Sequence, residues 1–336
     1  MVLQISKPAD RLVTGRANRR RFLAGIAAVG LTPAAVAAEA TIATRAQDRG
    51  GAIMARQTDE AVTTDYLTVP GARLYYEVSG SGPVLLLIPG GGMDAGGFAP
   101  LVSFLEDSYT VVRHDPRGIS RSSLDGPAED VPVEVHADDA QQLLLAFGDE
   151  PAFVLGSSGG AVIGLALVER HPELVQTFVA HEPPLTELLP EGSARRKGGQ
   201  EIYDTYLEEG AGPAMEKFMA VAGMEESAPP VEMSPEAQEF MAQAMARMEQ
   251  NVDFFLAHYL MPITSYVPDV AALQAGSSRV VVGVGEESGG QLANETALAL
   301  AERLGTEAVA FPGDHVGMAT HPEAFAEKMD EVFQAQ

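Results

Sequence analysis

A Gly-x-Ser-x-Gly pentapeptide between a strand pattern and a helix pattern constrains this chain more than any other feature. Residues 156–160 read GSSGG, after the apolar run 152–155 and before the helical run 162–169. A serine in such a turn lies at a helix N-terminus, where the dipole favours negative charge, and the glycines permit close backbone approach. The pentapeptide therefore predicts a tight turn that presents Ser158, rather than Ser157, as a nucleophile.

Strand patterns alternate with helix patterns around this turn. The run VLLLI at 84–88 is typical of a strand that is buried on both faces. The alternation predicts an α/β fold with a mostly parallel eight-stranded sheet and helices on both faces. Strands are expected at 66–69, 73–78, 84–88, 109–113, 152–155, 175–180, 279–284 and 308–311, and helices at 136–147, 162–169, 292–304 and 322–333.

One long segment interrupts the alternation. Residues 186–267 contain helical patterns only, which predicts a helical lid inserted after strand 6 between core segments 63–185 and 268–336. The lid is rich in methionine and aromatic side chains, which favours packing onto the core and also suits an adaptable apolar pocket. These residues are Met215, Met219, Met224, Met233, Met241, Met245, Met248 and Met261, with Phe218, Phe240, Phe254, Phe255 and Tyr259.

The N-terminal residues 1–40 predict an export signal. Residues 18–23 read NRRRFL, and the short apolar run 24–31 precedes an Ala-rich stretch with small residues suited to cleavage between Ala37 and Thr41. The paired arginines followed by Phe-Leu resemble the twin-arginine signal, so the expected partner is the twin-arginine export machinery. We expect a linker at 41–62 and a periplasmic or secreted mature protein.

Charge and cysteine content exclude several functions. The net charge is −25, and residues 1–40 carry six basic and two acidic side chains, which leaves 16 basic and 45 acidic for the rest. Such an acidic body repels phosphate backbones and anionic lipids, so we expect no nucleic-acid binding and no membrane insertion of the mature form. The chain has no cysteine, which excludes disulfides, thiolate metal sites and a cysteine nucleophile.

A glycine turn follows the strand pattern at 84–88. Residues 89–92 read PGGG, and such a turn can present backbone N–H groups to a carbonyl oxygen. We expect an oxyanion hole formed by Gly91 and by Gly159, the residue after the nucleophile. A phosphate-binding turn is the alternative, but no lysine follows and the G-x-G-x-x-G spacing does not fit.

His315 is the candidate base among seven histidines. It follows the strand pattern at 308–311, on a loop at the carboxyl end of the last predicted strand. Catalytic groups gather at that edge of a parallel sheet, and a serine nucleophile needs a base to accept its proton.

These elements together resemble the α/β-hydrolase superfamily over roughly residues 65–336. The PGGG turn, the DPRG sequence at 115–118, the serine turn and a late Gly-Asp-His occur in the family's order. The resemblance implies the α/β-hydrolase fold and a serine mechanism that needs no metal and no cofactor.

The acid of the triad departs from the family's usual pattern. Most members place an aspartate after the strand that corresponds to 279–284, where this chain has Ser288 by our count. Glu182 follows the strand pattern at 175–180, which the family's strand order places beside the nucleophile strand, so we favour Glu182. Glu286 and Glu287 are the alternative acids.

Two loops are similar to those of zearalenone-type lactonases. These are the GSSG of the serine turn and the His-Glu-Pro at 181–183. The export signal and the PGGG turn depart from those enzymes, so we do not transfer their substrate. The sequence predicts an exported hydrolase that cleaves apolar esters or lactones through Ser158, His315 and Glu182 with an acyl-enzyme. The alternatives are peptide, thioester or carbon–carbon bond hydrolysis, perhydrolysis, or a non-catalytic ligand-binding protein.

Overall fold

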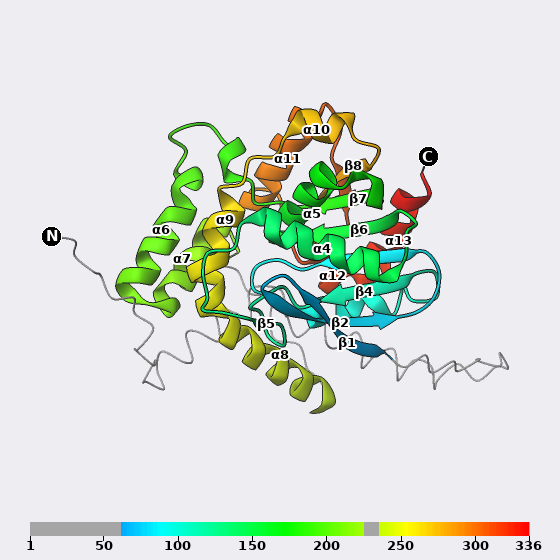
Figure 1. The fold of residues 1–336 in the computed structure, drawn as a ribbon. Coiled ribbons are helices and arrows are strands. Elements are labelled where there is room, and N and C mark those ends of the chain that lie inside the picture. The colour runs from blue at the N-terminus through cyan, green and yellow to red at the C-terminus, as the bar shows by residue number, and fades with distance from the viewer. Residues whose placement is uncertain (1–61, 225–234, 336) are drawn as a thin grey trace.

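A single open sheet forms the centre of the protein (Figure 1). The computed structural model describes residues 62–224 and 235–335. The strand order is β1-β2-β4-β3-β6-β7-β8-β9, and the two-residue strand β5 pairs with β2. The strands are β1 (Thr63–Val69), β2 (Ala72–Ser79), β3 (Val84–Ile88), β4 (Thr110–His114), β5 (Ser123–Leu124), β6 (Ala152–Ser157), β7 (Val175–His181), β8 (Arg279–Gly285) and β9 (Val309–Phe311).

The sheet is mostly parallel, as the sequence predicts. Strands β3, β4 and β6–β9 pair in parallel, whereas β1, β2 and β5 form antiparallel pairs at one end. All eight predicted strands are present, and β5 is an addition, because two residues are too few to produce an alternating pattern. The predicted α/β-hydrolase architecture is confirmed.

Helices cover both faces of the sheet. Alternate residues of β3 show the division, since Leu86 and Ile88 join one apolar cluster while Leu85 and Leu87 join another. The first cluster lies under α4 (Val133–Phe147), α5 (Gly159–Arg170), α10 (Val270–Ala275) and α11 (Leu292–Leu304), and the second under α3 (Ala99–Val102), α12 (Gly317–Thr320) and α13 (Pro322–Gln334).

The strand register brings several loops to one edge of the sheet. Ser157 pairs with His181, His181 pairs with Gly283, and Gly285 pairs with Phe311. The carboxyl ends of β6, β7, β8 and β9 are therefore level. The loops that follow these four strands begin beside one another, although they are far apart in the sequence.

The described residues between β7 and β8 form helices and turns. Figure 1 shows α6, α7 and α9 grouped beside the sheet and α8 running along its lower side. These helices are α6 (Ala194–Glu209), α7 (Ala211–Ala222), α8 (Pro235–Phe254), a π-helix (Phe255–Tyr259), α9 (Leu260–Thr264) and α10. Helices α6 to α9 and the π-helix form a helical insertion within 186–267, where the lid is predicted, whereas α10 belongs to the predicted core segment 268–336. Within 62–224 and 235–335, no helix is both long and apolar enough to span a membrane.

Two predictions from the sequence fall outside the described residues. These are the export signal at 1–40 and, except for Val62, the linker at 41–62. Both stay predictions.

Candidate active site

Ser158 occupies a sharp turn between β6 and α5. Its φ of 55° is in the left-handed region, and its N–H donates to the carbonyl of His181 at 2.9 Å. A Cβ atom on Gly156 would lie 2.4 Å from the Gly160 oxygen, and one on Gly160 would lie 2.0 Å from the Ile88 oxygen. Both glycines are therefore required by close backbone approach. Ser157 is the last residue of β6, so the turn presents Ser158 to the cavity described below.

His315 and Glu182 form the pair that the sequence predicts. His315 Nδ1 lies 2.6 Å from Glu182 Oε2. Glu182 has a φ of 50° and is fully buried. A residue with a side chain is uncommon in this left-handed region, and such positions cluster at functional sites. The carboxylate orients the imidazole with its proton on Nδ1, which leaves Nε2 free to accept a proton.

The other oxygen of Glu182 is bound by the neighbouring loop and helix. Its Oε1 accepts from the Gly285 N–H at 2.9 Å, from Asn294 Nδ2 at 3.3 Å and from the Ser288 hydroxyl. Asn294 Nδ2 also lies 3.0 Å from Ser288 Oγ. These donors satisfy a carboxylate that has no access to water, which a buried charge requires.

Ser288, which lies where most family members have an aspartate, therefore donates a hydrogen bond to Glu182. It is fully buried in the loop after β8, whereas Glu286 and Glu287 in the same loop are exposed. The recorded carboxylate contact of His315 is with Glu182. The structure thus brings Glu182 to His315 and leaves both alternative acids at the surface.

The surroundings lower the pKa of Glu182. Burial by itself raises the pKa of a carboxyl, but the hydrogen bond and charge of His315 and the Ser288 hydroxyl outweigh it and lower the pKa to about 2. The preceding residue, His181, is fully buried, and burial lowers its pKa to about 4. Its ring packs against Phe311 and Phe325. Glu182 is therefore negative and His181 neutral, an arrangement that would stabilise a positive charge on the imidazole of His315.

The glycine turn after β3 lies beside the serine turn. Met93 N–H donates to the Gly90 carbonyl at 2.9 Å, which closes the turn. A Cβ atom on Gly90 would lie 2.5 Å from the Gly159 nitrogen, so the two backbone segments are in direct contact. Gly91 and Gly159 both line the cavity that contains Ser158. The two predicted oxyanion-hole residues are therefore adjacent at the site.

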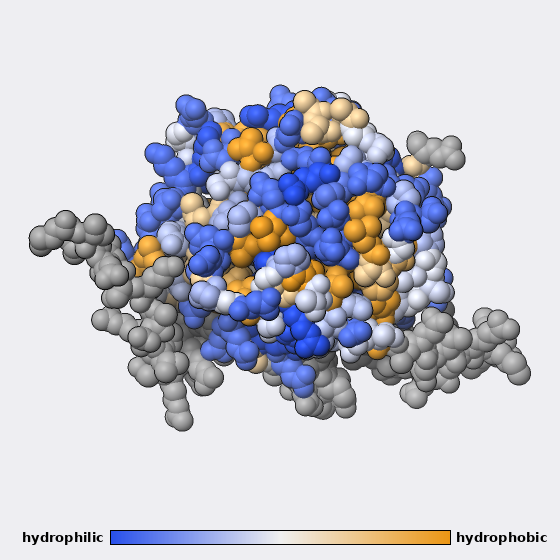
Figure 2. Space-filling model, in the orientation of Figure 1, coloured by the Kyte–Doolittle hydropathy of each residue, from blue (hydrophilic) through white to orange (hydrophobic). Residues whose placement is uncertain are grey.

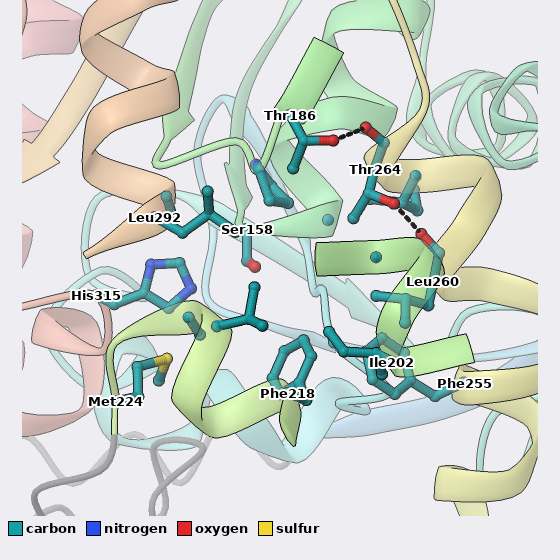
Figure 3. A pocket seen from close by; sticks show the side chains of 18 of the residues that line it. Ser158, Thr186, Ile202, Phe218, Met224, Phe255, Leu260, Thr264, Leu292 and His315 are labelled. Carbon is teal, nitrogen blue, oxygen red and sulfur yellow. Dashed lines mark hydrogen bonds between the residues drawn. The ribbon is translucent and has the colours of Figure 1, made fainter. Parts of the chain in front are cut away.

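An apolar cavity lies between these groups and the helices of the insertion (Figure 3). It encloses about 670 Å³ of space between atoms, with its opening included. Ser158 and His315 face this cavity from the core, and Phe218 of α7 and Phe255 of the π-helix face it from the insertion. Among the hydrogen bonds of the described residues, none joins the Ser158 hydroxyl to His315. Catalytic hydrogen bonds are often long without substrate.

Some methionines of the insertion pack in the apolar core and another lines the cavity, so both roles considered from the sequence occur. Met215, Met219 and Met248 are buried in the main apolar cluster, and Met224 lines the cavity. The side chains of Met233, Met241, Met245 and Phe240 lie outside the part that the structure describes. Tyr259 also lines the cavity; its hydroxyl is buried without a hydrogen-bond partner among described residues, and burial raises its pKa.

Several residues at the site were not identified from the sequence. Leu292 and Ala293 begin α11 and line the cavity, and Thr186 lines it from the segment after Glu182. The start of the predicted helix 292–304 was the available signal, because that helix follows the loop after β8 and therefore begins at the same edge of the sheet. Within the described ranges, no group of three acidic or histidine side chains is placed to hold a metal ion.

Comparison with known proteins gives consistent results. Residues 83–222 match the family model described as the alpha/beta hydrolase fold. The chain is 36% identical over 274 residues to the uncharacterized hydrolase YraK of Bacillus subtilis, an alignment that covers 80% of this chain and 96% of YraK. It is 30% identical to a zearalenone hydrolase of Cladophialophora bantiana, over 81% of this chain and 97% of that enzyme. The resemblance at two loops thus extends along most of the chain.

Solved structures show the same fold. An α/β hydrolase from Sphaerobacter thermophilus superposes with a TM-score of 0.60 at 25% identity, over 80% of this chain and 100% of that one. The enol-lactonase from Burkholderia xenovorans gives a TM-score of 0.62 at 18% identity, over 81% of this chain and 100% of that one, which shows a shared fold. With the sheet order and the serine turn, these relatives establish that the chain belongs to the α/β-hydrolase superfamily and is a hydrolase.

Proposed function

We propose that the protein is an exported serine hydrolase that cleaves carboxylic esters or lactones of apolar substrates. The observation that carries the proposal is the 2.6 Å contact between His315 Nδ1 and Glu182 Oε2, beside a cavity that Ser158 also faces. A serine after β6, a buried carboxylate after β7 and a histidine after β9 are the groups that acyl transfer requires.

The mechanism has two steps. The Ser158 hydroxyl attacks the substrate carbonyl while His315 Nε2 accepts its proton, and Glu182 stabilises the imidazolium that forms. The N–H groups of Gly91 and Gly159 bind the oxyanion of the tetrahedral intermediate. His315 then donates the proton to the departing alkoxide oxygen, which leaves an acyl-enzyme. In a lactone this alcohol stays attached to the acyl chain.

Water completes the cycle. His315 takes a proton from a water molecule as the water attacks the acyl-enzyme carbonyl. The second tetrahedral intermediate then breaks its bond to Ser158 Oγ, which receives the proton back from His315, and the carboxylic acid is released. The apolar character of the substrate is supported by the cavity wall, where Ile202, Phe218 and Phe255 face Ser158. The zearalenone hydrolase relative, named for a lactone substrate, supports the inclusion of lactones.

Hydrolysis of a panel of aryl esters and of small and macrocyclic lactones tests this proposal. Wild type should turn over at least one member, and Ser158→Ala should lose that activity almost completely. Ser157→Ala, which changes the adjacent serine at the end of β6, is the matched control and should stay active. Equal rates for wild type and Ser158→Ala would refute the serine mechanism.

Export is a separate part of the proposal. The arginine-rich sequence at 18–23 supports recognition by the twin-arginine machinery and a periplasmic or secreted location. Replacing Arg20 and Arg21 together by lysine should retain the protein in the cytoplasm of a bacterial host, as cell fractionation would measure. Unchanged export of this double variant would contradict the assignment.

A further inference from the structure

The turn that carries Gly91 contains two successive glycines with positive φ. Gly91 and Gly92 have φ values of 60° and 77°, so two successive residues are in the left-handed region. Glycine reaches this region freely but also leaves it freely, because it has no Cβ atom to restrict the backbone. The orientation of the Gly91 N–H therefore depends on contacts that hold the turn from outside.

Asn251 of α8 supplies such a contact. Its Nδ2 donates to the Gly92 carbonyl at 2.9 Å and to Ser120 Oγ at 2.9 Å, and its Oδ1 accepts from the Ser120 N–H at 2.8 Å. Ser120 is itself in the left-handed region, with a φ of 47°. Asn251 is 3% exposed. One buried amide therefore joins the insertion to the glycine turn and to the loop after β4.

The π-helix that follows Asn251 contacts the glycine turn at Gly92 and the serine turn at Gly159. A Cβ atom on Gly92 would lie 3.2 Å from the Phe255 Cβ, and one on Gly159 would lie 3.1 Å from a Tyr259 ring carbon. Asn251, Phe255 and Tyr259 are spaced four residues apart, so they face the core from one side of α8 and the π-helix.

A second polar contact holds the chain just beyond the turn. Arg247 Nε donates to Asp94 Oδ2 at 2.6 Å, and Asp94 Oδ2 also accepts from the Ser120 hydroxyl at 2.9 Å. Asp94 Oδ1 accepts from the Gly96 N–H at 2.9 Å. The residues after the glycine turn are thus held through Asp94, while the Gly92 carbonyl is held by Asn251.

We propose that Asn251 is a positioning residue for the oxyanion hole, and that docking of the insertion through Asn251 sets the orientation of the Gly91 N–H. This inference rests on the proposed serine mechanism. The oxyanion forms only in the transition state, so a displaced donor weakens transition-state binding far more than substrate binding. Loss of the Asn251 amide should therefore lower kcat and leave KM almost unchanged.

Two variants and one control test this role. Asn251→Asp keeps the side-chain size and the acceptor for the Ser120 N–H but lacks the amide donor to Gly92. Asn251→Ala removes all three hydrogen bonds. Gln250→Ala changes an exposed residue of the same helix and serves as the control. Thermal unfolding identifies any variant that does not fold, and Asn251→Asp remains informative if Asn251→Ala is unstable.

The measurements separate orientation from general loosening of the lid. We expect kcat to fall about tenfold to a hundredfold in both Asn251 variants, with KM within about threefold of wild type. Affinity for a trifluoromethyl ketone, which forms an oxyanion with Ser158, should fall in parallel with kcat. Affinity for the corresponding unreactive alcohol should hold within about twofold, since it needs no oxyanion hole.

Each result decides the inference. Undiminished kcat in folded Asn251 variants, or an equal loss of affinity for ketone and alcohol, would overturn the positioning role while the ester activity of wild type stands. Wild type that hydrolyses no ester or lactone and does not bind the ketone would overturn the proposed function, and this role with it.

Discussion

The loops after β7 and β8 leave neighbouring strands at the same edge of the sheet, yet their glutamates differ in burial and in hydrogen bonding. The first places Glu182 in full burial with a left-handed backbone, against His315. The second exposes Glu286 and Glu287 and buries Ser288. The two loops also cooperate, because Gly285 N–H and Ser288 Oγ bind the carboxylate of Glu182.

This difference is the reason that we propose Glu182, and not Glu286 or Glu287, as the triad acid. All three glutamates closely follow a strand, so all three lie near the same edge of the sheet. Glu182 alone among them is shown with a buried carboxylate whose oxygens are both hydrogen-bonded, one by the histidine and the other by donors of the β8 loop and α11. A buried charge is tolerated only with such partners.

The outer surface and the lining of the cavity also differ in polarity. Figure 2 shows a mainly hydrophilic surface on the side seen in Figure 1, with apolar patches among charged and polar residues. The lining of the Ser158 cavity, in contrast, is predominantly apolar. An exposed acid would be solvated by water at the surface, whereas the acid at Glu182 depends on protein donors.

The largest expected effect distinguishes the two loops directly. Glu182→Gln should lower kcat/KM by about 10²- to 10⁴-fold, because a neutral amide cannot stabilise the imidazolium of His315. Glu286→Gln and Glu287→Gln are the matched controls and should stay within about twofold of wild type. Ester hydrolysis by the three purified variants measures this, and a near-normal Glu182→Gln enzyme would remove Glu182 from the mechanism.

A smaller effect is expected from moving the acid to the second loop. Glu182→Ala removes the buried carboxylate, and adding Ser288→Asp places a new one in the β8 loop, whose residue 288 already contacts the Glu182 carboxylate. We expect the double variant to regain about tenfold to a hundredfold in kcat/KM over Glu182→Ala alone. Recovery that fails in a folded double variant, checked by its thermal unfolding, would show that only the β7 loop can orient His315.

The pH dependence of stability gives the next comparison. The pKa of Glu182 is lowered from its ordinary 4.5 to about 2, despite burial, by His315 and Ser288. A carboxyl with a lower pKa in the folded state stabilises the protein above pH 4.5, and this stabilisation is lost as the pH falls towards 2. The contribution is on the order of 3 kcal/mol.

Denaturant unfolding at several pH values measures that contribution. Wild type and Glu287→Gln should lose free energy of unfolding more steeply than Glu182→Gln between pH 4.5 and pH 2, the interval set by the two pKa values of Glu182. Parallel curves for the three proteins would contradict a strongly lowered pKa at Glu182.

The smallest effect concerns the hydroxyl that links the two loops. Ser288→Ala removes one of the donors to Glu182 Oε1 but leaves the Gly285 N–H and Asn294 Nδ2 in place. We expect kcat to fall about threefold to tenfold and the free energy of unfolding to fall by about 1–2 kcal/mol. Ser277→Ala, at an exposed serine before β8, is the control. A Ser288→Ala enzyme with normal rate and stability would show that the remaining donors suffice.

Much of the fold followed from local patterns. The eight main strands were predicted because buried parallel strands are short apolar runs, and the serine turn because its glycines are needed by close approach at Gly156 and Gly160. The two-residue strand β5 was missed, since its pairing with β2 is defined by a partner far away in the sequence. The cavity residues Leu292 and Thr186 carried no motif of their own.

Glu182 and Asn251 show what could not be predicted from local sequence patterns. The sequence placed Glu182, Glu286 and Glu287 at the ends of neighbouring strands, but burial and direction of a side chain depend on the backbone of the whole loop. Asn251 reads in the sequence as one polar residue on a helix, and its contact with Gly92 depends on where that helix docks.

The sequence by itself determined the family, the nucleophile turn and the positions of the main strands along the chain, because these depend on residues that are close together in the sequence. Tertiary structure decided which carboxylate meets His315 and which lid residue holds the glycine turn. Those contacts join residues more than a hundred positions apart, and only the packing of complete loops and helices brings them within hydrogen-bonding distance.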